Sequence, residues 1–328
     1  MPTFIDLCCG CGGFSIGLVD AGLQLVAGFD NNFAAIRSFN LNHPGKGVLA
    51  DIRELHLPEG AADVLVSGLP CQGYSTLGKR DANDPRNQLW EDFLRLVEEV
   101  RPLAGAVENV PLYLRSREYE QLRAGLERNG YVVEAGVVSA VNFGVAQRRE
   151  RAIILFAKGV APTIPEGKPG KPTVREALAG LPLVPDGKND HEPRRHGPRT
   201  LERFRHVPEG GTRACLPDEL KSECWKRTTK GATNSFGRLR WDEPADTLRT
   251  AFLKPETGRY IHPSEHRGLT VREGARLQGF RDEHRFWGNM EEKAAQIGNA
   301  VPPPVAKAVG EELLRLVSAI AGKVAEAA

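Results

Sequence analysis

The chain has 328 residues, 41% of them hydrophobic and 26% charged, and its formal net charge at pH 7 is +2. These values and the mean hydropathy of −0.35 are those of a globular protein of about two domains, and they exclude collagen-like, coiled-coil and fully disordered chains. No apolar run approaches the ~18 residues of a membrane span and no signal-peptide pattern opens the chain. We therefore expect a cytoplasmic protein without a membrane anchor.

The first half of the chain alternates short apolar runs with amphipathic stretches. Strands are predicted at Thr3–Leu7, Leu23–Phe29, Asp63–Ser67, Ala104–Val107, Val132–Val138 and Ala152–Phe156. Helices are predicted at Ser15–Ala21, Phe33–Leu41, Gln88–Val100 and Arg117–Asn129. This alternation predicts an α/β fold with a doubly wound, mostly parallel sheet and helices on both faces.

The pattern changes after Lys158. From Val160 to about Lys254 the chain is rich in proline, glycine and arginine, and residues 168–240 hold 16 Lys and Arg against 9 Asp and Glu. A basic module beside a mildly acidic remainder favours a polyanionic partner such as nucleic acid, although a solvated basic loop region is the alternative. Helical patterning resumes at Leu269, and a last helix is predicted over residues 304–323. The expected domains are 1–159, a small irregular module over 160–263, and a returning segment over 264–328.

The six cysteines are Cys8, Cys9, Cys11, Cys71, Cys215 and Cys224. Without a secretion signal they are expected to be reduced thiols. No Cys-x-x-Cys pair is present, and Cys215 and Cys224 supply at most half a zinc site, so we expect no bound metal.

A glycine turn follows the first predicted strand. Residues 6–15 read DLCCGCGGFS, and Asp30 ends the second strand about twenty residues later. Glycines let the backbone approach a ligand, and a carboxylate at that distance is placed to bind ribose hydroxyls. Ser15 stands where the third glycine of the dinucleotide fingerprint belongs, so the signal for an adenosine-containing ligand is weak by itself.

Three short motifs resemble other kinds of site and fail on inspection. Residues 13–17 match the hydrolase nucleophile elbow, but no triad partners stand out. Residues 68–75 have the spacing of a phosphate loop, but Tyr74 replaces its lysine. His191, Glu192 and His196 resemble a zinc-protease helix with one residue too many, and Pro193 would break that helix.

The strongest chemical signal is a set of reactive side chains at predicted strand ends. Cys71 follows the strand Asp63–Ser67 in a Pro-Cys-Gln turn, Glu108 follows the strand Ala104–Val107, and Gln147–Arg151 precedes the strand Ala152–Phe156. Each alone is more often a surface, capping or buried group. Together, a thiol, a carboxyl and guanidinium groups form a plausible site for nucleophilic attack on a polarised ring.

In chain order these segments closely resemble the motifs of the cytosine-C5 DNA methyltransferase family. The resemblance covers nearly the whole chain outside residues 160–254, on Asp6–Gly13, Asp30, Asp51-Ile52, Pro70-Cys71-Gln72, Glu108-Asn109-Val110, Gln147–Arg151, Arg267–Phe280 and Gln296–Pro302. It implies a Rossmann-like, S-adenosylmethionine-dependent methyltransferase domain with an inserted target-recognition domain over 160–263. It also implies a role in a bacterial restriction–modification system.

The resemblance assigns the catalytic roles. A thiolate of Cys71 would add to C6 of cytosine while Glu108 holds or protonates N3, which makes C5 nucleophilic enough to take the methyl group. Arg151 would bind the cytosine O2, and Arg149 would help to fix Glu108. Because C5 is inaccessible in a duplex, the base must be flipped into the pocket.

The resemblance also places the cofactor on residues from both ends of the chain. The set is Cys8, Cys9, Gly10, Cys11, Gly13, Asp30, Asn31, Asp51, Ile52, Pro70, Leu89, Asn299 and Ala300. The family usually has an aromatic residue at the position of Cys8 and a glutamate at that of Asp30, and an apolar or aromatic residue is frequent at that of Asn31. We expect S-adenosylmethionine binding to survive these departures, more weakly.

The implied substrate is double-stranded DNA, contacted by the basic segment, in which Asp246-Thr247-Leu248 resembles the family's Thr-Leu element. Candidate contacts are Arg194, Arg195, Arg203, Arg205, Arg227, Arg238 and Arg240, each of which could equally be a solvated surface residue. We expect a monomer at the bacterial or archaeal nucleoid, with a cognate restriction endonuclease in the same system but no stable protein partner.

Two other functions compete with this reading. A related branch methylates transfer RNA, but its Cys-Phe-Thr signature is absent from this sequence. A non-catalytic DNA-binding relative is disfavoured because Cys71, Glu108, Arg149 and Arg151 are all present.

Overall fold

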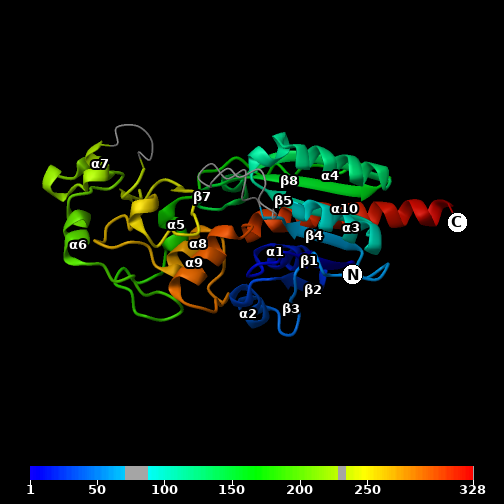
Figure 1. Ribbon diagram of the computed structural model, residues 1–328, viewed down its shortest axis with the longest axis horizontal. Helices are drawn as coiled ribbons and strands as arrows, with labels where there is room; N and C mark the ends of the chain where they lie inside the picture. The colour runs from blue at the N-terminus through cyan, green and yellow to red at the C-terminus, as the bar shows by residue number, and fades with distance from the viewer. Residues whose placement is uncertain (71–87, 228–233, 328) are drawn as a thin grey trace. The chain divides into compact units, whose positions relative to one another are not determined.

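The computed structural model describes residues 1–70, 88–227 and 234–327, which fall into two compact units (Figure 1). Unit 1 comprises Met1–Phe143, Glu150–Pro169 and Ala300–Ala328, and unit 2 comprises Gly144–Arg149 and Gly170–Asn299. This division differs from the expected domain boundaries. Unit 2 starts ten residues later than expected, runs on to Asn299, and takes a six-residue segment from between two strands of unit 1.

Unit 1 is built on a seven-stranded sheet in the order β3-β2-β1-β4-β5-β8-β6. The strands are β1 (Thr3–Leu7), β2 (Gln24–Asp30), β3 (Gly47–Leu49), β4 (Val64–Gly68), β5 (Ala104–Asn109), β6 (Tyr131–Ser139) and β8 (Glu150–Lys158). The pairs among β1 to β5 are parallel, whereas β8 runs antiparallel to both β5 and β6. The prediction of an α/β fold with a mostly parallel sheet is confirmed.

Helices cover both faces of this sheet (Figure 1). They are α1 (Gly13–Ala21), α2 (Phe33–Asn42), α3 (Leu89–Val100), α4 (Arg117–Arg128) and α10 (Pro303–Ala327). Helices α1 and α10 pack on each other, and α3 packs on α4. The direction of the connections explains this arrangement. The chain runs from β1 through α1 and α2 to β2 and β3 at one end of the sheet, and from β4 through α3 to β5 toward the other end. Because such connections are right-handed, the two sets of helices lie on opposite faces.

The face under α3 and α4 carries a continuous apolar core. Leu65 on β4, Val107 on β5, Phe93 on α3, Leu122 on α4 and Phe156 on β8 are all fully buried there. Helix α3 ends at Val100 because Arg101 adopts a left-handed backbone (φ 53°) and Pro102 follows.

The parallel strands bring four chain segments to one edge of the sheet. Strand β1 ends at Leu7, β2 at Asp30, β4 at Gly68 and β5 at Asn109. This is the edge at which open α/β sheets bind ligands. The predicted site residues on these four strands therefore converge there.

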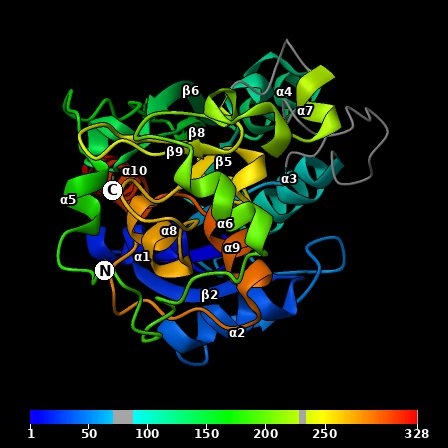
Figure 2. The ribbon, with the colours of Figure 1, turned by 90° about the vertical axis from the view of Figure 1, so that its left-hand side faces the viewer.

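Unit 2 consists of short elements joined by irregular segments, which can be followed in Figure 2. Two small sheets pair β7 (Gln147–Arg148) with β10 (Ala245–Asp246) and β9 (Gly237–Arg238) with β11 (Arg259–Ile261). The helices are α5 (Val174–Leu178), α6 (Pro198–Arg205), α7 (Glu223–Arg227), α8 (Val271–Leu277) and α9 (Met290–Asn299). Phe204, Val207, Leu216, Phe236 and Ile261 form a separate buried core.

Candidate active site

The loop after β1 has an unusual backbone. Cys8, Gly10 and Gly12 all have positive φ angles, of 62°, 57° and 95°. The loop is fixed by Asp30, whose Oδ2 accepts a hydrogen bond from the Gly10 N–H at 2.9 Å while its Oδ1 accepts one from Asn32 N–H at 2.8 Å. No heavy atom of the described residues lies within 4 Å of where a Cβ of Gly10 would be. The loop is thus held rigidly while leaving open space beside its backbone.

Burial keeps the three thiols of this loop protonated and therefore unreactive. Burial raises the pKa values of Cys8, Cys9 and Cys11, with nearby Asp30 adding to the effect, and Cys11 reaches about 12. The five cysteines within the described part of the chain are free thiols, as expected. The cysteines of the loop are therefore uncharged packing residues, with no tendency to act as nucleophiles.

Asp6 lies beneath the same loop and is fully buried on β1. Desolvation raises the pKa of its carboxyl to about 7, although the Ser15 hydroxyl donates a 2.6 Å hydrogen bond to Oδ2. Ser15 was noted in the sequence only as a break in the dinucleotide fingerprint. A hydroxyl in the first helical turn after a strand carrying an aspartate is the signal that would have identified this pair.

The next strand end supplies a second carboxylate. Asp51, which follows β3, forms a two-pronged ion pair with Arg53 at 2.9 and 2.5 Å. The hydrogen bonds from Arg53 lower the pKa of Asp51 to about 2, with a further bond from Asn31. Ile52 beside it is 3% exposed. Asp30, Asn31 and Asp51 therefore stand together at neighbouring strand ends.

A carboxylate and a guanidinium meet on the opposite side of β4. Glu108 on β5 is 6% exposed, and its Oε1 lies 2.7 Å from Nε of Arg151 on β8. The antiparallel pairing of β5 with β8 brings them together, since Asn109 lies opposite Ala152. Arg151 was expected to precede its strand and to bind substrate, and the structure places it inside the strand, paired with Glu108.

Gly68 joins these two halves of the site. A Cβ built on Gly68 would lie 3.9 Å from the Cys8 carbonyl oxygen, 3.9 Å from Glu108 Oε2 and 4.0 Å from Val301 Cγ2. The loop after β1, the catalytic carboxyl predicted from sequence, and the returning C-terminal segment are thus neighbours around one glycine. In the sequence, Gly68 stands out only as the first residue of the segment 68–75, whose spacing resembles a phosphate loop.

Other predicted residues of unit 1 lie near this edge or outside the described residues. Pro70 follows β4 and is half-buried, and Leu89 begins α3. Ala300 is the first residue of the returning segment of unit 1. Cys71 lies outside the residues that the structure describes.

Arg149 and Asn299 belong to unit 2. Arg149 is 1% exposed and donates hydrogen bonds to the carbonyl oxygens of Leu248 at 3.2 Å and Gly298 at 2.8 Å. It therefore ties the Thr-Leu element to the end of α9, which closes on Asn299. The division between the units falls between Arg149 and Arg151 in the sequence.

The arginines predicted to contact DNA have different environments. Arg238 is 3% exposed, and its guanidinium donates to the carbonyl oxygens of Phe204, Val207, His262 and Glu265. This corrects the expectation for Arg238, which holds unit 2 together from inside. Arg203 is half-buried over the ring of Trp225, whereas Arg195, Arg205, Arg227 and Arg240 are exposed.

The zinc-protease resemblance has no counterpart in unit 2. His191 is buried between the Thr270 hydroxyl and the Pro182 carbonyl, and His196 packs edge-on against Phe204. Within residues 1–70, 88–227 and 234–327, no three histidine, cysteine or acidic side chains are grouped as a metal site. In the same ranges no helix is both long and apolar enough to cross a membrane.

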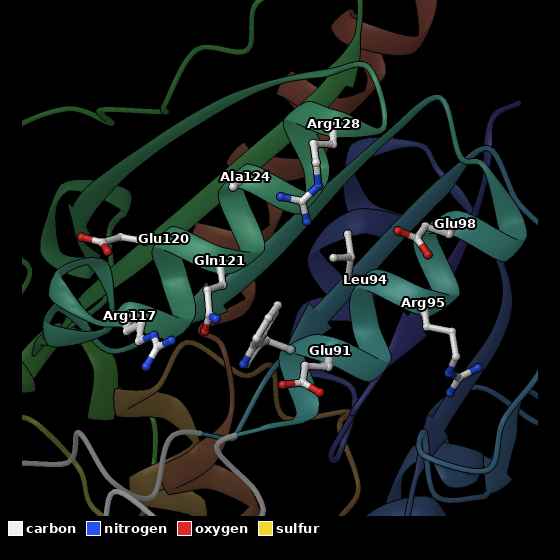
Figure 3. A pocket seen from close by; sticks show the side chains of 10 residues that line it. Glu91, Leu94, Arg95, Glu98, Arg117, Glu120, Gln121, Ala124 and Arg128 are labelled. Atoms are coloured by element: carbon white, nitrogen blue, oxygen red, sulfur yellow. The ribbon is translucent and has the colours of Figure 1, made fainter.

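A groove of about 540 Å³ lies between α3 and α4 (Figure 3). Glu91, Arg95 and Glu98 project from α3, and Arg117 and Arg128 from α4. None of the predicted site residues lines it, so it is separate from the candidate active site.

The doubly wound sheet and the groups at its carboxyl edge define an α/β enzyme with a glycine loop on one side of β4 and a buried Glu–Arg pair on the other. A family model described as C-5 cytosine-specific DNA methylase matches residues 2–315. The chain belongs to this family and is a DNA cytosine-5-methyltransferase.

Individual relatives agree with this assignment. The chain is 32% identical to the type II methyltransferase M1.HphI of Haemophilus parahaemolyticus, over 96% of this chain and 87% of the relative. It is 34% identical to the type II methyltransferase M.Eco47II of Escherichia coli, over 97% and 80% respectively. A crystal structure from E. coli, described as a prophage-encoded DNA modification methyltransferase, matches 97% of this chain and 100% of its own with a TM-score of 0.70 at 26% identity.

Proposed function

We propose that this enzyme transfers a methyl group from S-adenosylmethionine to C5 of a flipped-out cytosine in a specific double-stranded DNA sequence, through a covalent bond between Cys71 and C6. The observation that carries the proposal is the junction at Gly68. There the glycine loop and Glu108 stand on two sides of one residue, at the ligand-binding edge of a parallel sheet.

The residues at this edge fit S-adenosylmethionine, which when bound supplies a methyl group on a positively charged sulfur. The open space beside Gly10 leaves room for a ligand against the loop backbone, and the carboxylates of Asp30 and Asp51 suit the hydroxyl and amino groups of an adenosine. The residues proposed to hold it are Cys8, Cys9, Gly10, Cys11, Gly13, Asp30, Asn31, Asp51, Ile52, Pro70, Leu89, Asn299 and Ala300.

The cytosine is proposed to bind on the other side of Gly68. Glu108 would hold N3 and Cys71 would attack C6, so that electron density moves to C5. The pairing of Arg151 with Oε1 of Glu108 supports this role, and the same guanidinium would place positive charge beside the bound ring. Arg149 is proposed to help fix Glu108, from a segment that its bonds to Leu248 and Gly298 hold in place.

Unit 2 is proposed to read the DNA sequence. Its exposed arginines, Arg195, Arg205, Arg227 and Arg240, would contact phosphates and base edges. Because the relatives are named as type II methyltransferases, we place the enzyme in a restriction–modification system. We further propose that it acts as a monomer at the nucleoid, beside a cognate endonuclease.

The test is transfer of a labelled methyl group from S-adenosylmethionine to duplex DNA and, separately, to transfer RNA, with sequencing of the modified sites. The wild type should modify cytosines within one DNA sequence. Preferred labelling of transfer RNA, or of no nucleic acid, would overturn the proposal.

The covalent step has its own prediction. Cys71→Ala should abolish methyl transfer while S-adenosylmethionine and DNA still bind, because only the thiol forms the bond to C6. A duplex with 5-fluorocytosine at the target should form a stable adduct with the wild type and none with the variant, as resolved on a denaturing gel. Turnover by the variant within tenfold of the wild type would contradict the covalent mechanism.

A further inference from the structure

Neither the backbone conformation nor the packing of the described residues requires a glycine at position 68. Gly68 ends β4 with an ordinary φ, so its backbone does not require glycine. Ser67 and Leu69 on either side are 0% and 5% exposed, whereas Gly68 is partly open. Gly105 on neighbouring β5 shows the contrast, because a Cβ there would lie 2.2 Å from Phe156 and 2.4 Å from the Leu65 carbonyl oxygen.

The open side of Gly68 faces both proposed reactants. The Cys8 carbonyl belongs to the proposed cofactor loop, and Oε2 belongs to the carboxyl proposed to hold the cytosine. Oε1 of the same carboxyl pairs with Nε of Arg151 at 2.7 Å, so that Oε2 is the oxygen next to Gly68. Val301 closes the third side. An added methyl group would touch all three at ordinary contact distance and would displace none of them.

We propose that Gly68 sets the size of the alkyl group that the enzyme can bind and transfer. The proposal rests on the proposed function, since it places the donor carbon between the loop and Glu108. In the transfer, the bond from that carbon to sulfur breaks and its electron pair stays on sulfur. A new bond to C5 forms from the ring's electrons, and the C5 proton then leaves to solvent as Cys71 is expelled. The space beside Gly68 is thus proposed to limit the bulk of the moving carbon.

The first measurement is binding, by calorimetry on the full chain. Gly68→Ala should bind S-adenosylhomocysteine, which lacks the moving carbon, within about threefold of the wild type. It should bind S-adenosylmethionine about 5- to 150-fold more weakly, the range that ~1–3 kcal/mol of overpacking gives. The S-ethyl analogue should be weaker still. Equal losses for all three ligands, or none, would overturn the proposal.

The second measurement is the ratio of ethyl to methyl transfer to duplex DNA. Gly68→Ala should lower this ratio, and Val301→Ala, which enlarges the same space from the opposite side, should raise it. Gly322→Ala is the matched control, because a Cβ there meets no heavy atom of residues 1–70, 88–227 and 234–327 within 4 Å. Ratios unchanged in both active-site variants would refute the size limit.

Two controls distinguish a failure of the proposed role of Gly68 from a failure of the proposed function. Thermal melting of Gly68→Ala should stay close to that of the wild type, because among the described residues the added carbon meets nothing nearer than 3.9 Å. If that variant does not fold, Val301→Ala alone still decides the question. A wild type that binds no S-adenosylmethionine would refute the proposed function, whereas a wild type that binds it and variants without size dependence would refute only the role of Gly68.

Discussion

At the scale of single residues, the site is organised by buried charge. Glu108 and Arg151 are both largely withdrawn from water and lie 2.7 Å apart. A buried carboxylate without a cation would be strongly unfavourable, and the guanidinium compensates it while leaving the other oxygen toward Gly68. The same pairing lets one arginine hold the carboxyl and, in the proposed mechanism, also face the cytosine. The sequence assigned these tasks to two different arginines because spacing along a strand does not reveal which side chains share a face with a partner strand.

Asp6 gives a pH-dependent prediction. Its folded-state pKa of about 7 lies above the ordinary value, so between about pH 4 and pH 7 the folded protein holds a proton that the unfolded chain has lost. Stability from this group is therefore full in acid and falls as the pH rises, by about 1.4 kcal/mol per pH unit. Asp6→Asn, which keeps an acceptor for Ser15, removes the dependence.

The measurement is the free energy of unfolding of wild type and Asp6→Asn at pH 5, 6 and 7. The variant should gain on the wild type by about 1.4 kcal/mol for each pH unit, and level off above pH 7. A constant difference across this range would show that Asp6 ionises normally.

At the scale of elements, helix α10 completes the sheet domain from the far end of the chain. It packs on α1 at backbone distance, since a Cβ on Gly17 would lie 2.4 Å from Ala306 Cβ and 2.5 Å from the Pro303 carbonyl oxygen. Such an approach is possible only where one partner has no side chain. The first helix after the glycine loop is thus clamped by the last helix of the chain.

Replacing that glycine should loosen the clamp. Gly17→Ala should destabilise the protein by about 1–3 kcal/mol, because the added methyl meets main-chain atoms that cannot rotate away. Gly322→Ala, in the exposed part of the same helix pair, should instead stabilise by about 0.5–1 kcal/mol through helix propensity. Chemical denaturation of both variants checks the signs, and a neutral Gly17→Ala would contradict the close packing.

The elements also show how far sequence patterns reach. Six strands and four helices were predicted within one or two residues, because buried parallel strands are continuous apolar runs and the helices have clear periodicity. Strand β3 was missed because Gly47–Leu49 is too short to carry a pattern and two of its residues are exposed. The antiparallel direction of β8 was not predicted either, since apolar patterning does not encode strand direction.

At the scale of the whole molecule, two units with separate cores carry the two tasks proposed for the enzyme. Unit 2 owes its form to buried arginines more than to regular structure. The guanidinium groups of Arg238 and Arg272 donate hydrogen bonds to backbone carbonyl oxygens, and Arg267 pairs with Glu273 at 2.7 and 2.9 Å. The sequence showed this segment as an arginine-rich surface because charge counts do not distinguish a buried guanidinium from a solvated one. The irregular segments also lack periodicity, so sequence patterns do not show where one compact unit ends and the other begins.

Unit 2 should respond to acid in the opposite sense to Asp6. His262 is 2% exposed, and burial lowers its pKa to about 4 against the opposing effect of Glu273 at 3.6 Å. The arginines 238 and 267 and His191 also disfavour its protonation. Between pH 6.5 and about 4 the unfolded chain binds a proton that the folded unit does not, so stability falls as the pH falls.

Hydrogen exchange resolves this effect unit by unit. From pH 6.5 to pH 5, protection of the Leu239 and Leu269 amides, which bond to β11, should fall by about tenfold per pH unit after correction for intrinsic rates. His262→Asn should lack this change, and amides of β4 should not show it. Equal loss of protection in β4 would point to a general acid effect instead.

The short segment Gly144–Arg149 has an evolutionary consequence. If unit 2 reads the DNA sequence as proposed, a recombination event that exchanges the continuous block 170–299 would change the target sequence. Strand β7 would stay behind with the recipient, yet it pairs with β10 inside the exchanged block, and Arg148 bonds the Pro244 carbonyl and Glu243 there. A hybrid enzyme would therefore need a β10 in the exchanged block that pairs with the β7 of the recipient. Compatibility at a few backbone and ion-pair contacts, more than the sequence that binds DNA, would decide which hybrid genes yield a working enzyme.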